Sequence, residues 1–250
     1  MGFFDGFARF YTTSETSPYP DRLNSRHEAI IERNVGYLTG ARVLDIASHD
    51  GRWSFAALQA GAAHVTGFEP RQELIDNARE TFAHYGIEPS RFTFKRGDVF
   101  DLIRGQKFDV VLCLGFFYHT VRQVELLDLI ERTGAALVVI DTEVTPAIGQ
   151  IAVGDQERSD PRMVYNNPYS VQLLRDEVSN QQMAWEDSMT REGFTLVARP
   201  SRAAVTFMAC HFGYAVETFS WSEFFENNPS AAASMVDYNE GWRDTFFCRH

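Results

Sequence analysis

The feature that most constrains this chain is a regular alternation of short apolar runs with segments of helical periodicity between residues 40 and 142. Apolar runs of four to eight residues favour buried strands, and amphipathic stretches closed by glycine favour helices. Strands that alternate with helices predict a doubly wound α/β fold, with a parallel sheet and right-handed crossovers. The predicted strands are 42–46, 64–69, 91–95, 108–115 and 135–141, and the predicted helices are 51–60, 72–85 and 123–132.

The flanking segments complete a sheet that we expect to have seven strands. Residues 1–40 are predicted to form an N-terminal cap, irregular to residue 24 and then helical from Asn24 or Ser25 through Tyr37. The main domain is expected to cover residues 41–250. Within it, the polar stretch of about 144–200 breaks the alternation and indicates a lid-like insertion. A helix over 201–212 and strands over 215–221 and 242–249 then predict a terminal antiparallel hairpin.

Composition limits the function classes. The net charge of −11 on 250 residues disfavours a phosphate backbone as the default partner, so nucleic acid is not expected. The three cysteines suit neither a zinc site nor a disulfide framework. No leader peptide and no run of about 18 apolar residues is recognisable, so we expect a cytoplasmic protein without a membrane span. A homodimer is the candidate assembly.

Acidic residues stand where the predicted strands end. Ligands of doubly wound folds bind beyond the carboxyl ends of the strands, so these positions are the candidate site. The turn 47–51 leads from the first strand into a helix N-terminus, which can present backbone N–H groups to a ligand. The acidic positions are Asp45, Glu69, Asp98 and Asp141.

The order of these signals resembles motifs I to IV of the class I S-adenosylmethionine-dependent methyltransferases. The resemblance covers about residues 40–142, from Asp45 and Gly51 to the run 108–119. It implies S-adenosylmethionine as the cofactor and assigns a part of it to each position. Asp45 and the turn from Ala47 to Gly51 would hold the methionine end, and Glu69 would bind the ribose. The adenine would lie at Asp98 and Val99, and backbone groups of Leu114 and Gly115 would meet the methionine part.

The turn departs from the family pattern at two positions. Ala47 and His49 occupy places where the family often has glycine, and only Gly51 remains. The change at Ala47 is mild if its φ is negative. The absence of G-x-G-x-x-G argues against a nicotinamide enzyme.

His119 is the candidate general base. It ends the segment 115–119, which resembles a branch of the family whose fourth motif ends in Tyr-His and which includes the tRNA wobble-uridine carboxymethyl-transferring enzyme. A histidine can remove a hydroxyl proton near neutral pH, although His119 could instead cap the next helix or fill a wall. Phe117 and Tyr118 are expected to line the substrate pocket.

Asp141 and Glu143 are a candidate metal pair. Two carboxylates two residues apart face the same way on an extended chain and could bind Mg²⁺, or they could be solvated charges at a strand end.

The leading hypothesis is therefore a methyltransferase that acts on a small molecule, at a hydroxyl of a sugar or secondary metabolite. The acidic charge and the aromatic residues favour a neutral acceptor. Two alternatives stay open: a tRNA-modifying methyl- or carboxymethyl-transferase, and a catalytically inactive partner protein with the same fold.

Overall fold

The computed structural model describes residues 2–12, 19–145, 169–175 and 190–250. Most of the predicted insertion, together with residues 13–18, lies outside the described residues. No helix among the described residues is long and apolar enough to cross a membrane.

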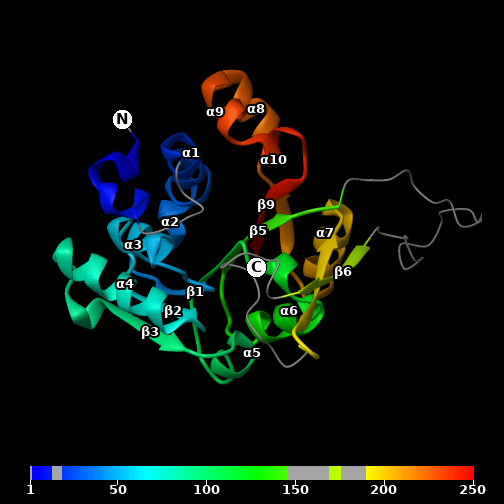
Figure 1. Cartoon of the computed structure of the whole chain (residues 1–250), viewed down its shortest axis with the longest axis horizontal. Coiled ribbons are helices and arrows are strands. Elements are labelled where there is room, and N and C mark those ends of the chain that lie inside the picture. Colours follow the sequence, from blue (N-terminus) through cyan, green and yellow to red (C-terminus); the bar gives the residue numbers. More distant parts are fainter. Residues whose placement is uncertain (1, 13–18, 146–168, 176–189) are drawn as a thin grey trace, which may run out of the picture.

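A seven-stranded sheet in the order β3-β2-β1-β4-β5-β9-β8 forms the centre of the molecule (Figure 1). All neighbouring strands from β3 to β5 are parallel, whereas β9 is antiparallel to both β5 and β8. The doubly wound sheet and its antiparallel end are confirmed. The strands are β1 Arg42–Ile46, β2 His64–Glu69, β3 Phe92–Arg96, β4 Val110–Leu114, β5 Leu137–Glu143, β8 Ala215–Thr218 and β9 Arg243–Arg249.

Alternate residues of each central strand supply two separate cores. Leu112 of β4 packs with α3 (Arg52–Gln59) and α4 (Gln72–His84) on one face. Its neighbour Val111 packs with α6 (Gln123–Glu131) and α7 (Arg202–His211) on the other. Because both faces are covered, the strands are almost continuously apolar, as the sequence indicates.

The N-terminal segment is more ordered than predicted. Two short 3₁₀ helices, Phe3–Gly6 and Ala8–Tyr11, bury Phe4 and Phe10 completely in the core on the α3 side. The following helix, α1, covers Pro20–Ile30 and so begins before Asn24, near which the helix was predicted to start. Its first residue is proline, whose fixed φ and missing N–H suit a helix start. A 3₁₀ turn, Glu32–Asn34, separates α1 from α2 (Val35–Leu38).

The C-terminal connection was predicted wrongly as a strand to residue 221 followed by polar loop. The strand ends at Thr218, and Trp221 begins the first of three short helices. Its ring contacts those of Phe225 and Tyr238, and this aromatic packing makes the connection part of the core. The helices are α8 Trp221–Asn227, α9 Pro229–Ser234 and α10 Val236–Asn239. The short helix α5, Val99–Leu102, was also not predicted.

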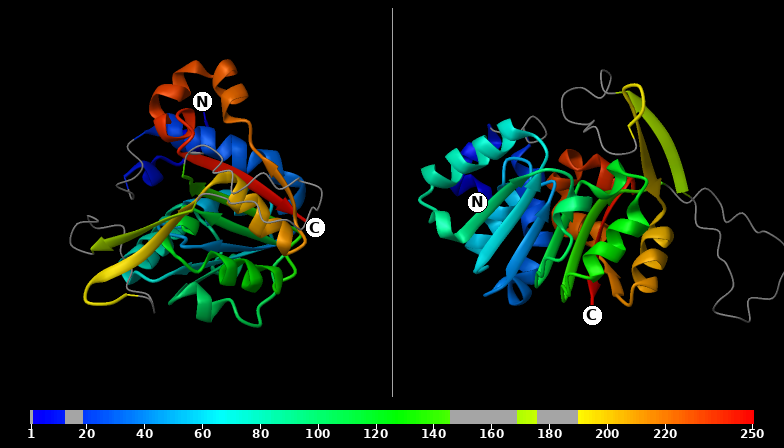
Figure 2. Two further views of the ribbon diagram at one scale, coloured as in Figure 1. Left: turned by 90° about the vertical axis from the view of Figure 1, so that its right-hand side faces the viewer. Right: turned by 90° about the horizontal axis from the view of Figure 1, so that it is seen from below.

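The described part of the insertion is an antiparallel hairpin of β6 (Tyr169–Arg175) and β7 (Phe194–Pro200). Figure 2 shows it projecting beside the sheet, next to α6 and α7. Gln123 links the hairpin to the turn that follows β4, since its side-chain amide donates hydrogen bonds to the carbonyl oxygens of Phe117 and Ala198. β7 therefore lies against the 3₁₀ turn Phe117–His119, where the candidate base is located.

Candidate functional site

The turn after β1 adopts the left-handed conformation at three alternate positions. The φ angles are +54° at Ala47, +54° at His49 and +75° at Gly51. These are the positions where the resemblance calls for glycine, so the backbone keeps a glycine-type path with two non-glycine residues. Since φ is positive at Ala47, the condition under which this change would be mild is not met. The third position of the turn has no room for a side chain, because a Cβ at Gly51 would lie 3.0 Å from the rings of Phe82 and Phe94.

Glu69 lies at the end of β2, and its carboxylate is held by the turn. The backbone N–H of His49 donates to Oε2 at 3.0 Å, and Arg71 donates to Oε1 through its side chain at 2.8 Å and its backbone at 3.2 Å. The side chain is fully buried. A carboxylate offers about four acceptor positions, so at least one remains for a hydroxyl group. Because the side chain is fully buried, a ribose hydroxyl would reach this position only after the residues around Glu69 shift, and the ribose assignment stays a prediction.

Asp45 is buried below this turn, and the hydroxyl of Ser54 donates to it at 2.7 Å. Burial raises the pKa of Asp45 to about 7, and the nearby charges of Asp50 and Glu69 act in the same direction. Asp45 therefore fixes the start of α3 and adds to the acidic character of this part of the site.

The remaining predicted cofactor residues also lie at strand ends. Asp98 caps α5 by accepting from the N–H of Phe100 at 2.9 Å, and Val99 beside it is buried. Gly115 has a φ of +98°, and its N–H donates to the carbonyl oxygen of Asp141 at 2.8 Å. Leu114 precedes it at the end of β4. The parallel register of β1, β2, β4 and β5 brings the carboxyl ends of these strands together on one side of the sheet.

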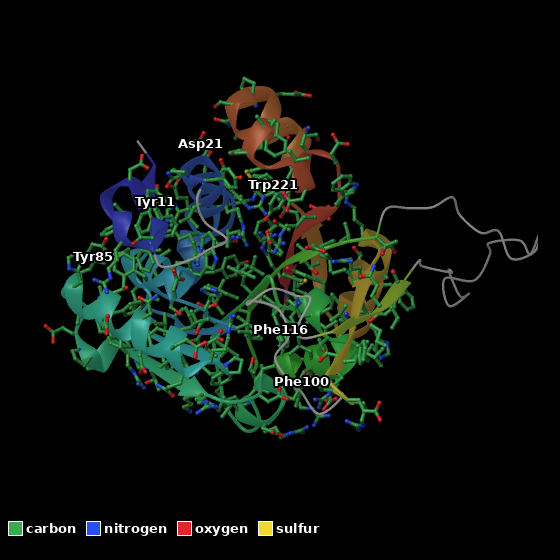
Figure 3. The ribbon with its side chains drawn as sticks, viewed as in Figure 1. Tyr11, Asp21, Tyr85, Phe100, Phe116 and Trp221 are labelled. Atoms are coloured by element: carbon green, nitrogen blue, oxygen red, sulfur yellow. The ribbon has the colours of Figure 1, made fainter. Side chains whose placement is uncertain are left out.

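The aromatic segment after β4 differs in part from the prediction. Phe117 is fully buried in the core on the α6 side, so it does not line a pocket. Phe116 is only partly buried and lies near Phe100, as Figure 3 shows, with ring centroids 6.4 Å apart. Tyr118 faces the guanidinium group of Arg243, which lies 5.4 Å from its ring centroid.

His119 packs its ring 4.0 Å from that of Tyr118, and its Nδ1 atom is buried without a hydrogen-bond partner among the described residues. Burial lowers the pKa of His119 to about 3, and the positive charges of Arg243, Arg199 and Arg71 act in the same direction. The imidazole is therefore neutral at physiological pH and can accept a proton. It is a much weaker base than an unperturbed histidine.

The predicted magnesium pair finds no support. Asp141 accepts from Arg243 at 2.7 Å, from Arg26 at 3.1 Å, and from the hydroxyls of Tyr238 and Thr245. Glu143 forms an ion pair with Arg199. Arginines thus occupy both carboxylates, and no group of three metal-ligating side chains occurs in the described ranges.

Sequence reasoning missed the arginines. Arg26, Arg199 and Arg243 lie on α1, β7 and β9, and none of them belongs to a recognisable motif. Their common place beside Asp141 and Glu143 depends on the register of β5 with β9 and on the position of the hairpin. Only a signal that identifies spatial neighbours could have revealed them.

Comparisons with known proteins show what this chain is similar to. Residues 43–137 match the family described as a methyltransferase domain. The chain is 37% identical over 103 residues to the ribosomal RNA large subunit methyltransferase I of Klebsiella pneumoniae, and 31% identical over 106 residues to that of Erwinia tasmaniensis. These matches cover 39% and 40% of this chain, and the chain spans only about a quarter of the relatives' length (24% and 26%).

Solved structures match over nearly the whole chain. The N-terminal domain of EvdMO1 with SAH bound has a TM-score of 0.61 at 17% identity, covering 96% of this chain and 83% of that one. The DhpI–SAH complex has a TM-score of 0.55 at 15% identity, with coverages of 98% and 93%. Residues 43–137 thus match a methyltransferase domain, and the chain as a whole has the fold of structures solved with SAH bound.

Proposed function

We propose that this chain is a methyltransferase that uses S-adenosylmethionine to methylate a hydroxyl group of a small molecule. The observation that carries the proposal is the Glu69 carboxylate, which the N–H of His49 holds at the end of β2 beside the left-handed turn. A fixed carboxylate next to a helix N-terminus suits the ribose of a nucleoside cofactor.

Different residues of the chain would bind the cofactor and transfer the proton in this reaction. Glu69, Asp98 and the turn at Ala47–Gly51 would hold the cofactor, and Gly115 would offer its backbone to the methionine part. When bound, S-adenosylmethionine supplies an activated methyl group whose carbon–sulfur bond breaks as the bond to the acceptor oxygen forms. His119 takes the proton of that hydroxyl and later releases it to solvent. Positioning supplies much of the rate, since the methyl group is already reactive.

The small-molecule assignment draws on the structural neighbours. EvdMO1 was also solved in the presence of SAH and D-fucose, and DhpI was solved as a SAM–HEP complex. Both resemble this chain over more than 90% of its length. The ribosomal RNA relatives share about 40% of it, so an RNA acceptor has support only from the shared domain. Binding of bulk ribosomal RNA or tRNA at moderate salt would favour that alternative.

The test is calorimetric titration with S-adenosylhomocysteine. We expect micromolar affinity, about −7 to −8 kcal/mol. The variant Glu69→Ala should weaken binding by about 1.5–3 kcal/mol, because a charge-assisted acceptor is lost. Glu88→Ala, an exposed carboxylate on the loop before β3, is the matched control and should bind like the parent. If the parent does not bind at all, the proposed function fails.

A further inference from the structure

Three arginines from distant parts of the chain converge on the carboxyl end of β5. We call Arg26, Arg199 and Arg243 the arginine cluster. Arg26 and Arg243 share the single carboxylate of Asp141, while Arg199 pairs with Glu143. Counted over the described residues, three cations thus meet two carboxylates, and the cluster carries one positive charge in excess.

Within the part of the chain that the structure describes, the other charged groups beside the cluster do not cancel this excess. Arg22 pairs with Asp237 in a two-pronged ion pair at 2.6 and 2.7 Å, and Arg202 pairs with Asp244. Each of these pairs is neutral by itself. Burial raises the pKa values of Tyr118 and Tyr238, so both phenols stay uncharged. Water screens the excess weakly, because the side chains of Arg243 and Arg26 are only 8% and 12% exposed.

The cluster also has hydrogen-bonding capacity that the described residues do not use. The Nε atom of Arg26 is buried without a hydrogen-bond partner among them. Arg243 donates through its Nε to Asp141 and also hydrogen-bonds the side chain of Tyr118, so the unused donor that the described residues leave in the cluster is the Nε of Arg26. A buried guanidinium with unused donors is costly unless an acceptor completes it. An oxyanion provides that acceptor and the missing negative charge together.

The cluster lies beside the candidate base. Arg243 faces the ring of Tyr118, which packs against His119, and β7 brings Arg199 to the same turn. The Nδ1 atom of His119 lacks a hydrogen-bond partner in the described structure. An anion at the cluster would therefore contact the place where the acceptor must present its hydroxyl.

We propose that the acceptor carries an oxyanionic group, a carboxylate or a phosphate, which the arginine cluster binds beside His119. This inference rests on the proposed function and replaces the expectation of a neutral acceptor. The net charge of −11 does not oppose it, since the local balance at β5 is positive. A bound anion offsets the arginines, raises the proton affinity of His119, and so makes the base effective only when the correct acceptor is present.

The first experiment measures binding of inorganic phosphate, and separately of acetate, to protein saturated with S-adenosylhomocysteine. We expect at least one of the two to bind, and Arg199→Gln or Arg243→Lys to weaken binding by about 10- to 100-fold through lost charge-assisted bonds. Glu143→Gln should strengthen it, because the excess positive charge grows by one. Arg104→Gln, at an exposed pair with Glu125, is the control and should have no effect. Thermal unfolding confirms that each variant is folded, and Arg199 is the safer site because its side chain is 32% exposed.

The second experiment separates the acceptor from the carboxylate of the cofactor itself. Phosphate or acetate binding is compared in complexes with S-adenosylhomocysteine and with 5′-methylthioadenosine, which lacks that carboxylate. Equal anion affinity in both complexes supports the proposal. Binding only in the methylthioadenosine complex would overturn it, because the cluster would then belong to the cofactor. The proposal also fails if neither anion binds, or if Arg104→Gln weakens binding as much as Arg199→Gln. In each case the affinity for S-adenosylhomocysteine reports separately on the proposed function.

Discussion

Two buried aspartates at the same edge of the sheet have opposite acid–base properties. Burial raises the pKa of Asp45 on β1 to about 7, and the nearby carboxylates Asp50 and Glu69 add to the effect. Burial also favours the neutral form of Asp141 on β5, but Arg26 and Arg243 outweigh it and hold its pKa well below the ordinary value. The pKa values of the two side chains differ because of the charges beside them, since both side chains are almost fully buried.

This contrast divides the site into two halves. In the half at β1 and β2, Glu69 pairs with Arg71 and Asp50 with Arg52, so none of the described arginines is in excess there. The carboxylate oxygens of this half suit the ribose hydroxyls of the cofactor. The half at β5, β7 and β9 has excess arginine, which suits an anionic acceptor. His119, after β4, lies between them because β4 separates β1 from β5.

The largest expected effect concerns His119, which joins the two halves. His119→Ala should reduce turnover by roughly 10²–10⁴, the usual contribution of a positioned base. Its affinity for S-adenosylhomocysteine should stay near that of the parent. Turnover is measured with the first hydroxy acid or phosphorylated alcohol that the parent methylates, and His211→Ala on α7 is the control. Normal turnover in His119→Ala would exclude the histidine as the base.

The pH profile of the same reaction adds a second observation. Because the pKa of His119 is lowered to about 3, kcat/KM should show no ascending limb near pH 6.5. An ascending limb of kcat at higher pH than that of kcat/KM would indicate that a bound anion has raised the pKa.

The next prediction compares how the two aspartates contribute to the free energy of unfolding. Asp141→Asn should lower the free energy of unfolding by about 3–5 kcal/mol, because it leaves two buried guanidinium groups without their carboxylate. Asp45→Asn should cost much less at pH 7, since Asp45 is already near half protonation there. Urea unfolding of both variants measures the difference. Equal losses would show that the contrast between the halves is not electrostatic.

Asp45 also predicts a pH dependence of stability. A folded-state pKa raised from 3.8 to about 7 means that the native protein favours the protonated carboxyl. Its contribution is fully present below pH 3.8 and is lost as the pH rises through 7. The free energy of unfolding of the parent should therefore fall relative to that of Asp45→Asn between pH 4 and 7, and then run parallel. A constant difference across this range would contradict the shift.

The smallest effects concern the turn that distinguishes the cofactor half. Gly51→Ala should destabilise the protein by about 1–3 kcal/mol, because the added Cβ meets the rings of Phe82 and Phe94. Ala47→Gly should stabilise the protein by about 0.4–1 kcal/mol, because the φ angle of Ala47 is +54°. Urea midpoints report both. A loss of stability in Ala47→Gly would show that its side chain is needed for packing.

The sequence was informative where the structure is local. Each strand-end residue of the cofactor half follows its own strand, so a pattern along the chain was sufficient to place Asp45, Glu69 and Asp98. The register between parallel strands then follows from the fold class.

The acceptor half depended on contacts that no local pattern carries. Arg26 and Arg243 are 217 positions apart and meet only because α1 packs near β5 and β9. Phe117 was assigned to a pocket because an apolar residue at a strand end can face either a ligand or the core. The sequence left the φ angle of Ala47 open, and the path from β1 to α3 places it in the left-handed region.

Amide hydrogen exchange with S-adenosylhomocysteine, and then with an anionic ligand added, tests the division into halves most directly. The cofactor alone should protect amides of the turn 47–52 and those of Glu69 and Arg71, because these backbone groups form its half of the site. The anion should then protect residues 117–120 and the start of β9. Protection by S-adenosylhomocysteine that is confined to the β5–β9 side, or absent from the turn at 47–52, would contradict the account.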